Sequence, residues 1–459
     1  MRKGSLKAVA RMMGRPYRVA IICILFLLLT LNQLGYFLSP ELHSLFPYQY
    51  VQTSRRAAAP EILNSTLGFE KVFVVNLPER TDRRDAMTLG TAVSNISVTW
   101  INGIMGSAVS SKVLPADSFD KTISRGNKGS WRAHMNALQT IIDQNLTSAL
   151  IMEDDIDWDI RIKSQLQVFA QAARAFTQPA ASESSNSARD SPKVPLAQAE
   201  SFNPADATEN TVVELPATRL PHKKLRPTSS PYGDDWDVLW LGHCGTEFPT
   251  KSKSEPKAKP KSPPPTRPNT GYTPKTNPEQ VPLPLLRVTI PNDITVPQPQ
   301  HLKPHPFALP DPLGEEYPPH TRIVHASSAT ICTQAYAVSQ QGARKLLHQF
   351  GLLSLTAGWD LMLKDWCDGA YFDGYAYAQQ QGKKRTRPPV CVTVQPPLFS
   401  HHYGKASASD IMSPGGGFLN RIGRGEMTPY IRYSVRLNMG KLVEGVRDLE
   451  GLVDQLPDN

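Results

Sequence analysis

The feature that most constrains this chain is a short apolar stretch that ends abruptly in carboxylates. Residues 149–158 read ALIMEDDIDW, so an apolar run leads directly into Glu153, Asp154 and Asp155, with Asp157 two positions on. This pattern predicts a buried strand whose carboxyl end opens onto a site, because α/β sheets bind their ligands at the carboxyl ends of strands. A solvated acidic turn is the alternative that the stretch by itself leaves open.

Carboxylates packed this closely repel one another at neutral pH, and a bound divalent cation relieves the repulsion. Oxygen ligands favour Mg²⁺ or Mn²⁺ over zinc. We therefore predict a metal ion on two of these carboxylates, Asp155 with Asp157 or Glu153, and the downstream His401 is a further candidate ligand. A metal on one or two carboxylates keeps open positions for substrate phosphates, so the expected guest is a nucleotide diphosphate. For His401 the alternative is an exposed loop histidine.

The N-terminus carries an apolar stretch, Val19–Leu38, which six basic residues precede. About 20 apolar residues span a bilayer, and the cationic flank stays cytosolic. We predict a cytosolic tail over 1–18, a transmembrane signal anchor over 19–38 and a stem over 39–68, with the bulk of the chain lumenal. A short span suits a Golgi or ER membrane, and a cleaved signal peptide is the alternative.

Two further features fit a lumenal location. The chain has N-glycosylation tripeptides that begin at Asn64, Asn95 and Asn145. Outside the apolar stretch it has four cysteines, and in an oxidising compartment these form disulfides in any of three pairings. No two of them have the spacing of zinc ligands, which disfavours a zinc site. The four are Cys244, Cys332, Cys367 and Cys391.

The formal net charge of +9 does not indicate nucleic-acid binding, because the basic residues form no aromatic-studded face or known motif. The 41 prolines are too many for one compact body. We assign the excess to disordered insertions over 177–231 and 249–320, which interrupt a single domain over 69–430. Apolar residues at spacings of three and four predict a C-terminal helix over 431–459.

Three other segments carry candidate site residues. A strand-like run, 69–77, stops before the basic residues Arg80, Arg83 and Arg84, which could pair with a diphosphate; a solvated first helical turn is the alternative. His134 lies at the edge of the apolar face of a helix that Ser130 is expected to cap, where a structural histidine is the alternative. Asp360 begins an apolar turn, where a helix cap is the alternative.

Taken together, these segments resemble glycosyltransferase family 25, which includes bacterial lipooligosaccharide and animal procollagen galactosyltransferases. The motifs occur in the family's order. Asn127, Ser130 and Ala133 depart from the usual Glu, Cys and Ser, and the long insertions are not typical of bacterial members. The matching motifs are Asn76–Arg84, Gly126-x-x-Gly129 with His134, Ile151–Asp155, Trp236–Gly242 and Ala335–Leu347.

The resemblance implies a GT-A-type α/β fold with a mainly parallel central sheet. It also implies a Mn²⁺ or Mg²⁺ ion and inverting transfer of a sugar, with UDP-galactose as the expected donor, onto a lumenal glycoprotein or glycolipid. Alternatives are an inactive, membrane-anchored member that binds glycans or mediates adhesion, and a metal phosphohydrolase. The expected donor-binding residues are Asn76, Arg80, Arg84, Glu153 and Asp154. Asp360 is the candidate base, because it is an isolated carboxylate at a strand-to-helix junction, and His134 is a further catalytic candidate.

Overall fold

The computed structural model describes residues 59–118, 122–177, 212–217, 228–249, 285–305, 309–372, 389–404 and 426–458. All of them belong to one unit, Arg56–Asn459. The predicted cytosolic tail, the predicted anchor and most of the predicted stem lie outside the described residues. Within the described ranges, no helix has the length and apolar character needed to cross a bilayer.

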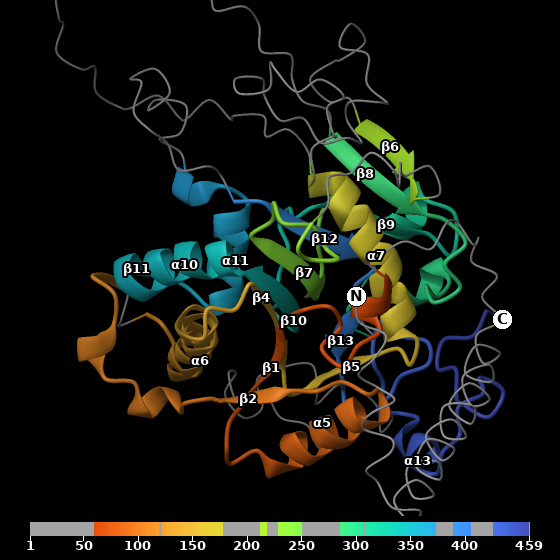
Figure 1. Ribbon diagram of the computed structural model, residues 1–459, viewed down its shortest axis with the longest axis horizontal. Helices are drawn as coiled ribbons and strands as arrows, with labels where there is room; N and C mark the ends of the chain where they lie inside the picture. Colours follow the sequence, from red (N-terminus) through yellow and green to blue (C-terminus); the bar gives the residue numbers. More distant parts are fainter. Residues whose placement is uncertain are drawn as a thin grey trace, which may run out of the picture. The chain divides into compact units, whose positions relative to one another are not determined.

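An 11-stranded sheet organises the described chain (Figure 1). Nine of its strands follow the order β2-β1-β4-β10-β7-β12-β9-β8-β6, while β13 pairs with both β5 and β7. A separate two-stranded sheet joins β3 (Asp117–Ser118) to β11 (Ser354–Leu355). The strands of the main sheet are β1 (Lys71–Asn76), β2 (Thr99–Asn102), β4 (Ser148–Glu153), β5 (Ile156–Trp158), β6 (Val212–Pro216), β7 (Val238–Gly242), β8 (Leu285–Ile290), β9 (Arg322–Ala326), β10 (Ala335–Ser339), β12 (Cys391–Gln395) and β13 (Phe399–His401).

The sheet is mixed, so the prediction of a mainly parallel sheet is wrong. Strands β2, β1 and β4 run parallel, but β10 runs antiparallel to both β4 and β7, and β9 runs antiparallel to both β12 and β8. A strand that is buried on both faces reads as an apolar run whichever way it points. The sequence AYAVS of β10 therefore predicts a central strand without giving its direction.

The expectation of long disordered insertions is wrong for two segments that lie inside them. Residues 212–216 form β6 and residues 285–290 form β8, and these two strands pair in parallel at one edge of the sheet. In β8 the alternate side chains of Leu286, Val288 and Ile290 are buried in the core. The short apolar runs were hidden by the proline-rich sequence around them, which dominated the composition of each segment.

Helices cover both faces of the sheet because successive strand residues point to opposite sides. In β4, Leu150 and Met152 join the core beneath α5 and α7, while Ala149 and Ile151 join the core beneath α6, α10 and α11. Figure 1 shows α6, α10 and α11 on one side of the sheet and α7 on the other. These helices are α5 (Thr81–Val93), α6 (Arg125–Asp143), α7 (Ile162–Thr177), α10 (Gln340–Leu346) and α11 (Trp359–Cys367).

The C-terminal segment is less helical than the sequence predicts. Within 431–459 the structure has only α13 (Met439–Val443) as a helix in its described part, and α13 contacts α5. Glycines at 440, 445 and 451 interrupt the apolar repeat, and Gly445 has a positive φ of 92°. Shorter helical segments elsewhere are α4 (Ala59–Ile62), α9 (Leu313–Glu316), the 3₁₀ turns Gly106–Ala108, Ser111–Val113, Pro299–His301 and Ala370–Phe372, and the π-helical segment Leu347–Leu353.

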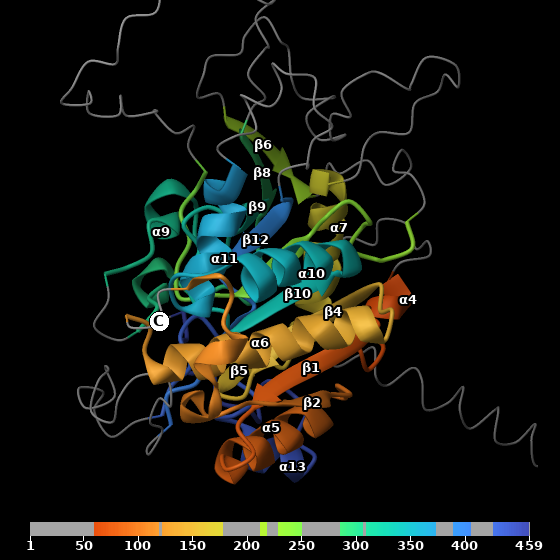
Figure 2. The same ribbon diagram turned by 90° about the vertical axis from the view of Figure 1, so that its left-hand side faces the viewer.

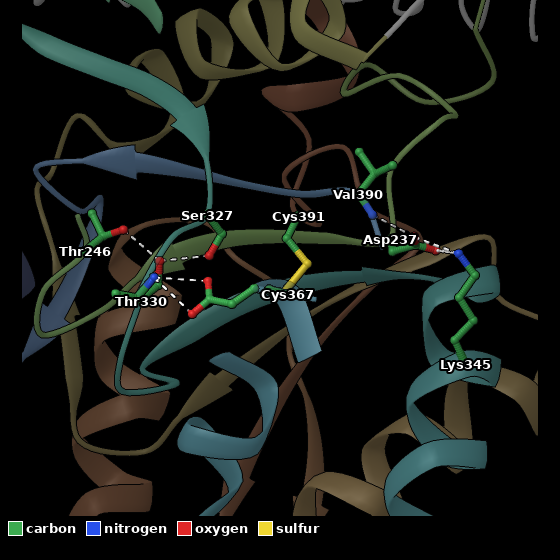
Figure 3. The surroundings of a disulfide bond; sticks show 10 residues. Asp237, Thr246, Ser327, Thr330, Lys345, Cys367, Val390 and Cys391 are labelled. Carbon is green, nitrogen blue, oxygen red and sulfur yellow. Dashed lines mark hydrogen bonds and ion pairs between the residues drawn. A yellow bond between two sulfur atoms is a disulfide. The ribbon is translucent and has the colours of Figure 1, made fainter. Parts of the chain in front are cut away.

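Two disulfides select one of the three pairings that the sequence left open. Cys244, just after β7, pairs with Cys332 in the loop before β10, and Cys367 at the end of α11 pairs with Cys391 at the start of β12. Figure 3 shows the second bond beside Asp237, which accepts hydrogen bonds from Lys345 Nζ (2.8 Å) and Val390 N (2.9 Å). Both disulfides thus fasten loops or helices to the central strands.

Candidate active site

The carboxyl ends of the neighbouring strands β1 and β4 border a cavity of about 300 Å³. The acidic turn, defined here as residues 153–157, leaves β4 at this point and leads into β5. The cavity therefore lies where the apolar run of β4 predicted a site. Its lining includes Arg83 of α5, the loop 103–107, residues of α6 from Arg125 to His134, and the three carboxylates Glu153, Asp154 and Asp155.

Arg83 binds the carboxylates of the acidic turn from α5. Its Nη1 lies 2.8 Å from Asp154 Oδ1 and 2.9 Å from Asp155 Oδ2. Asn76, the last residue of β1, donates a hydrogen bond from Nδ2 to the other oxygen of Asp154 (2.8 Å). Both oxygens of Asp154 are thereby held, and its carboxylate is fixed toward β1 and α5.

His401 reaches the acidic turn from the far end of the sequence. Strand β13 pairs antiparallel with β5 and places His401 opposite Ile156. His401 Nδ1 then lies 3.5 Å from Asp155 Oδ1, a buried oxygen that accepts no hydrogen bond from any described residue. Burial alone would raise the pKa of Asp155, but its electrostatic interactions with His401 and Arg83 outweigh burial and hold that pKa below its ordinary value.

This pair of donors fits a divalent cation. An ionised carboxylate oxygen without a hydrogen bond and a neighbouring imidazole are ligand types that Mn²⁺ accepts. The described ranges contain no group of three or more His, Cys, Asp or Glu side chains arranged as a metal site. A cation on Asp155 and His401 would therefore keep most of its coordination positions for a ligand such as a diphosphate.

Glu153 differs from Asp155 in its environment. Thr333 Oγ1 donates a hydrogen bond to Glu153 Oε1 (2.9 Å), and His134 Nε2 lies 3.9 Å from the same oxygen. Burial, followed by the negative charge of Asp155, raises the pKa of Glu153 to about 8. Two carboxyl groups that are two positions apart therefore differ in their tendency to ionise.

His134 lines the cavity as a neutral side chain. It is only 2% exposed, its Nδ1 shares a hydrogen bond with the Tyr336 hydroxyl (2.9 Å), and its ring stacks on Trp359 with centroids 5.4 Å apart. Burial lowers the pKa of His134 to about 3. An imidazole this weakly basic is a poor proton acceptor at neutral pH, so the geometry favours a binding role.

Asp360 lies in the first turn of α11, beside the cavity but outside its lining. Its Oδ2 accepts a hydrogen bond from the backbone N–H of Cys332 (3.2 Å). Asp360 is close enough to Glu153 for its charge to contribute to the raised pKa of Glu153. The Cys244–Cys332 disulfide thus fixes the loop that orients Asp360.

Asp157 does not face the cavity. It is 0% exposed and accepts four hydrogen bonds. Their donors are the backbone N–H groups of Trp158 (2.8 Å) and Arg436 (3.1 Å) and the hydroxyls of Thr428 (2.7 Å) and Ser434. Strand alternation alone would place residues 155 and 157 on the same side. Asp155, however, lies in the turn between β4 and β5, whereas Asp157 lies within β5, so the turn separates the directions of the two side chains.

Two of the three arginines named from the sequence, Arg80 and Arg84, also lie outside the cavity lining. Arg80 pairs with Asp82 at 2.7 Å, and Arg84 lies over the Trp100 ring at 4.5 Å from its centroid. Arg83, the third of them, lines the cavity. The periodicity of α5 contained this information, because Met87, Gly90 and Thr91 form its buried stripe and position 83 lies on the same side.

Two glycines bring the loop 103–107 against the start of α6. A Cβ atom on Gly106 would lie 1.6 Å from Arg125 O, and one on Gly129 would lie 2.5 Å from Ile104 O. The helix begins at Arg125 with Ser124 as its N-cap, not at Ser130 as expected, so the Gly126-x-x-Gly129 motif lies inside the first turns. The motif permits backbone contact that closes one side of the cavity.

Arg436, in the C-terminal segment, binds backbone carbonyls of the acidic turn. Its Nη2 donates to the carbonyl of Asp154 (2.8 Å) and its Nε donates to the carbonyl of Ile156 (2.9 Å). Together with the backbone bond from Arg436 N to Asp157, these contacts fasten the C-terminal segment to the turn. No local pattern could have indicated Arg436, because 282 positions separate it from Asp154.

Comparison with known proteins matches residues 69–246 to the family model described as glycosyltransferase family 25 (LPS biosynthesis protein). Procollagen galactosyltransferase 1 of Danio rerio is 29% identical over 120 residues, which cover 24% of this chain and 20% of that protein. Procollagen galactosyltransferase 2 of Homo sapiens is 27% identical over 111 residues, which cover 22% of this chain and 18% of that protein.

A third relative is the inactive glycosyltransferase 25 family member 3 of Homo sapiens, 23% identical over 128 residues, which cover 26% of this chain and 22% of that protein. The chain thus matches only about a fifth of the length of these relatives. The family match includes β1, the Arg83 helix and the whole acidic turn. The resemblance seen in the sequence is therefore confirmed over residues 69–246, which match the model of glycosyltransferase family 25.

Proposed function

We propose that this protein is a metal-dependent, inverting glycosyltransferase that moves galactose from UDP-galactose onto a glycoprotein or glycolipid acceptor. The observation that carries the proposal is the ionised Asp155, whose buried Oδ1 accepts no hydrogen bond from the described residues and lies 3.5 Å from His401 Nδ1. The relatives named procollagen galactosyltransferase support galactose as the sugar.

Asp155 and His401 would hold Mn²⁺ or Mg²⁺. The cation would supply positive charge where the diphosphate leaving group gains negative charge, which stabilises the transition state more than the ground state. Arg83 keeps the two aspartates in place and adds a second positive charge at the cavity wall. Asn76 assists by fixing Asp154.

Inverting transfer is a single displacement at the anomeric carbon. An acceptor hydroxyl oxygen forms the new bond to carbon as the bond to the diphosphate oxygen breaks, and a base takes the hydroxyl proton. Asp360 is our candidate base, since it is a carboxylate beside Glu153 and outside the cavity that would hold the donor. His134, which lines the cavity and is supported by its stacking on Trp359, would form part of the wall against which the donor lies.

The secretory pathway is the proposed location, in the lumen of the Golgi or ER. Two disulfides that join distant segments require an oxidising compartment to form and persist.

The test uses the full chain and measures UDP release from a panel of UDP-sugars with and without Mn²⁺. We expect Mn²⁺-dependent release from UDP-galactose, and its loss in Asp155→Asn. Asp143→Asn is the matched control, because Asp143 is an exposed carboxylate at the end of α6. A rate of UDP release that is the same with and without Mn²⁺, or that is unchanged in Asp155→Asn, contradicts the metal-dependent mechanism.

The relative named inactive glycosyltransferase 25 family member 3 makes an inactive, glycan-binding protein the second candidate. Calorimetric titration with UDP and Mn²⁺ separates the two. Binding of UDP without turnover of any UDP-sugar, with a panel of glycoprotein and glycolipid acceptors present, would favour the binding protein. Turnover of one donor excludes it.

A further inference from the structure

The three N-glycosylation tripeptides lie at the same end of the sheet. Asn64 precedes β1, Asn95 lies between α5 and β2, and Asn145 lies between α6 and β4. Strands β2, β1 and β4 are parallel neighbours, so their amino ends share one edge. Three tripeptides that are far apart in the sequence therefore meet at one pole of the domain, which we call the amino-end pole.

All three asparagines are exposed. Asn95 and Asn145 have positive φ angles, 51° and 54°, and each follows the last turn of a helix. This is the left-handed conformation that asparagine tolerates better than most residues, and it projects the side chain from a tight turn. Asn64 instead forms a local turn in which its Oδ1 accepts hydrogen bonds from Thr66 N (2.8 Å) and Thr66 Oγ1 (3.1 Å).

Hydrogen bonds join the three loops into one surface. Ser97 N donates to Ser65 O (2.7 Å), which links the first two tripeptides. Thr147 donates hydrogen bonds from N (2.6 Å) and Oγ1 (2.9 Å) to Glu70 Oε2. These bonds link the third tripeptide to the residue that precedes β1. Lys163 Nζ adds bonds to the carbonyls of Leu63 (3.1 Å) and Asn95 (3.0 Å).

The amino-end pole lies opposite the cavity. Six-residue strands such as β1 and β4 separate the two ends by about 20 Å, at about 3.3 Å per residue. Figure 2 shows the start of β1 and the last turn of α6 beside α4. The first turns of α6, which line the cavity, lie at the opposite end of that helix. Groups attached at this pole would leave the cavity open.

We propose that Asn64, Asn95 and Asn145 all carry N-linked glycans, which cover the amino-end pole and leave the cavity pole as the approach for the acceptor. The donor is a lipid-linked oligosaccharide diphosphate of the secretory pathway. The asparagine Nδ2 forms the new bond to the sugar's anomeric carbon, the bond from that carbon to the lipid diphosphate breaks, and the transferring enzyme takes the amide proton. The inference rests on passage through that pathway and is independent of the catalytic proposal.

The experiment expresses the full chain in animal cells and digests it partially with peptide N-glycosidase. We expect a ladder with three steps below the undigested band, and one step fewer for each of Asn64→Asp, Asn95→Asp and Asn145→Asp. Aspartate keeps the acceptor oxygen and tolerates the left-handed backbone, so the fold is preserved. Fewer than three steps in the unaltered chain overturns the proposal, and this reading does not depend on any variant folding.

Asn292→Asp is the matched control. Asn292 is also exposed and has a similar φ of 57°, but no Ser or Thr stands two positions after it. We expect its ladder to equal that of the unaltered chain. We also expect the variant that combines all three substitutions to release UDP at the rate of the unaltered chain. A loss of ten-fold or more, in a triple variant that still melts cooperatively, would show that the glycans or the amino-end pole affect turnover in the cavity. That result would overturn the proposed separation of the two poles.

Discussion

Asp155 and Asp157 are two positions apart in the acidic turn, yet they belong to opposite sides of it. Asp155 faces the cavity, is paired with Arg83 and retains a buried oxygen that accepts no hydrogen bond from the described residues. Asp157 faces the C-terminal segment and accepts four hydrogen bonds. The difference shows that burial and charge alone do not identify a functional carboxylate.

The number of hydrogen bonds already made is the more informative property. A buried carboxylate that accepts several hydrogen bonds is held in one geometry and cannot release them to a ligand without leaving donors unpaired. A buried ionised carboxylate with an unpaired oxygen has capacity for a cation or a substrate group. On this reasoning Asp155 should control turnover, whereas Asp157 should control stability, and each prediction below tests one part of the contrast.

The largest expected effect is on turnover in Asp155→Asn. Removing the charge from the site should lower Mn²⁺-dependent UDP release about 10³-fold, as for the loss of a major electrostatic contact in a transition state. The melting temperature should change by only a few degrees, because Arg83 keeps its pair with Asp154. UDP release and thermal melting are measured on the same preparation. Retained turnover in Asp155→Asn would show that Asp155 does not control turnover.

Asp157→Ala should produce the opposite result. The substitution leaves several buried donors without an acceptor, so the free energy of unfolding should fall by about 3 kcal/mol. Chemical denaturation measures this loss, with Asp143→Ala as an exposed control expected to change stability by less than about 0.5 kcal/mol. An Asp157→Ala protein as stable as the unaltered chain would refute the structural role.

Arg83→Met tests the cation on the cavity side. Removing the guanidinium leaves Asp154 and Asp155 to repel each other without their shared partner, and kcat/KM for the donor should fall about 100-fold, or about 2.7 kcal/mol. Arg84→Met is the control, since Arg84 stacks on Trp100 outside the cavity lining. Equal losses in the two variants would show that the arginines act through general charge and not through the acidic turn.

The sequence was sufficient for the parts of this site that depend on local pattern. The apolar run of β4 and its carboxylate end predicted the position of the cavity, because burial and strand termination are local properties. The glycines of the Gly126-x-x-Gly129 motif were noticed for the same reason, although their purpose became clear only from the backbone contact with residues 104 and 106. The choice between Arg83 and Arg84 required the phase of α5, which the buried stripe at Met87 and Thr91 would have supplied.

Features that depend on strand direction or on distant pairing could not be read in this way. The antiparallel insertion of β10 between β4 and β7 leaves no trace in an apolar pentapeptide. The same holds for β13, which brings His401 beside Asp155, and for Arg436, which reaches the turn from the C-terminal segment. These contacts form only when the whole sheet is assembled, so their information lies in the topology.

The smallest expected effect concerns Arg436, which links the two sides of the turn. Arg436→Lys keeps the positive charge beside Asp157 but cannot donate to the carbonyls of both Asp154 and Ile156 as the guanidinium does. The turn should loosen, and the dissociation constant for UDP at fixed Mn²⁺ should rise about tenfold, or about 1.4 kcal/mol, with little change in melting temperature. Arg432→Lys is the control, because Arg432 pairs with Asp454 and Asp458 in the same segment without touching the turn. If Arg436→Lys lowers the melting temperature but leaves UDP affinity unchanged, then Arg436 belongs with Asp157 as a purely structural residue, and the two sides of the turn are energetically separate.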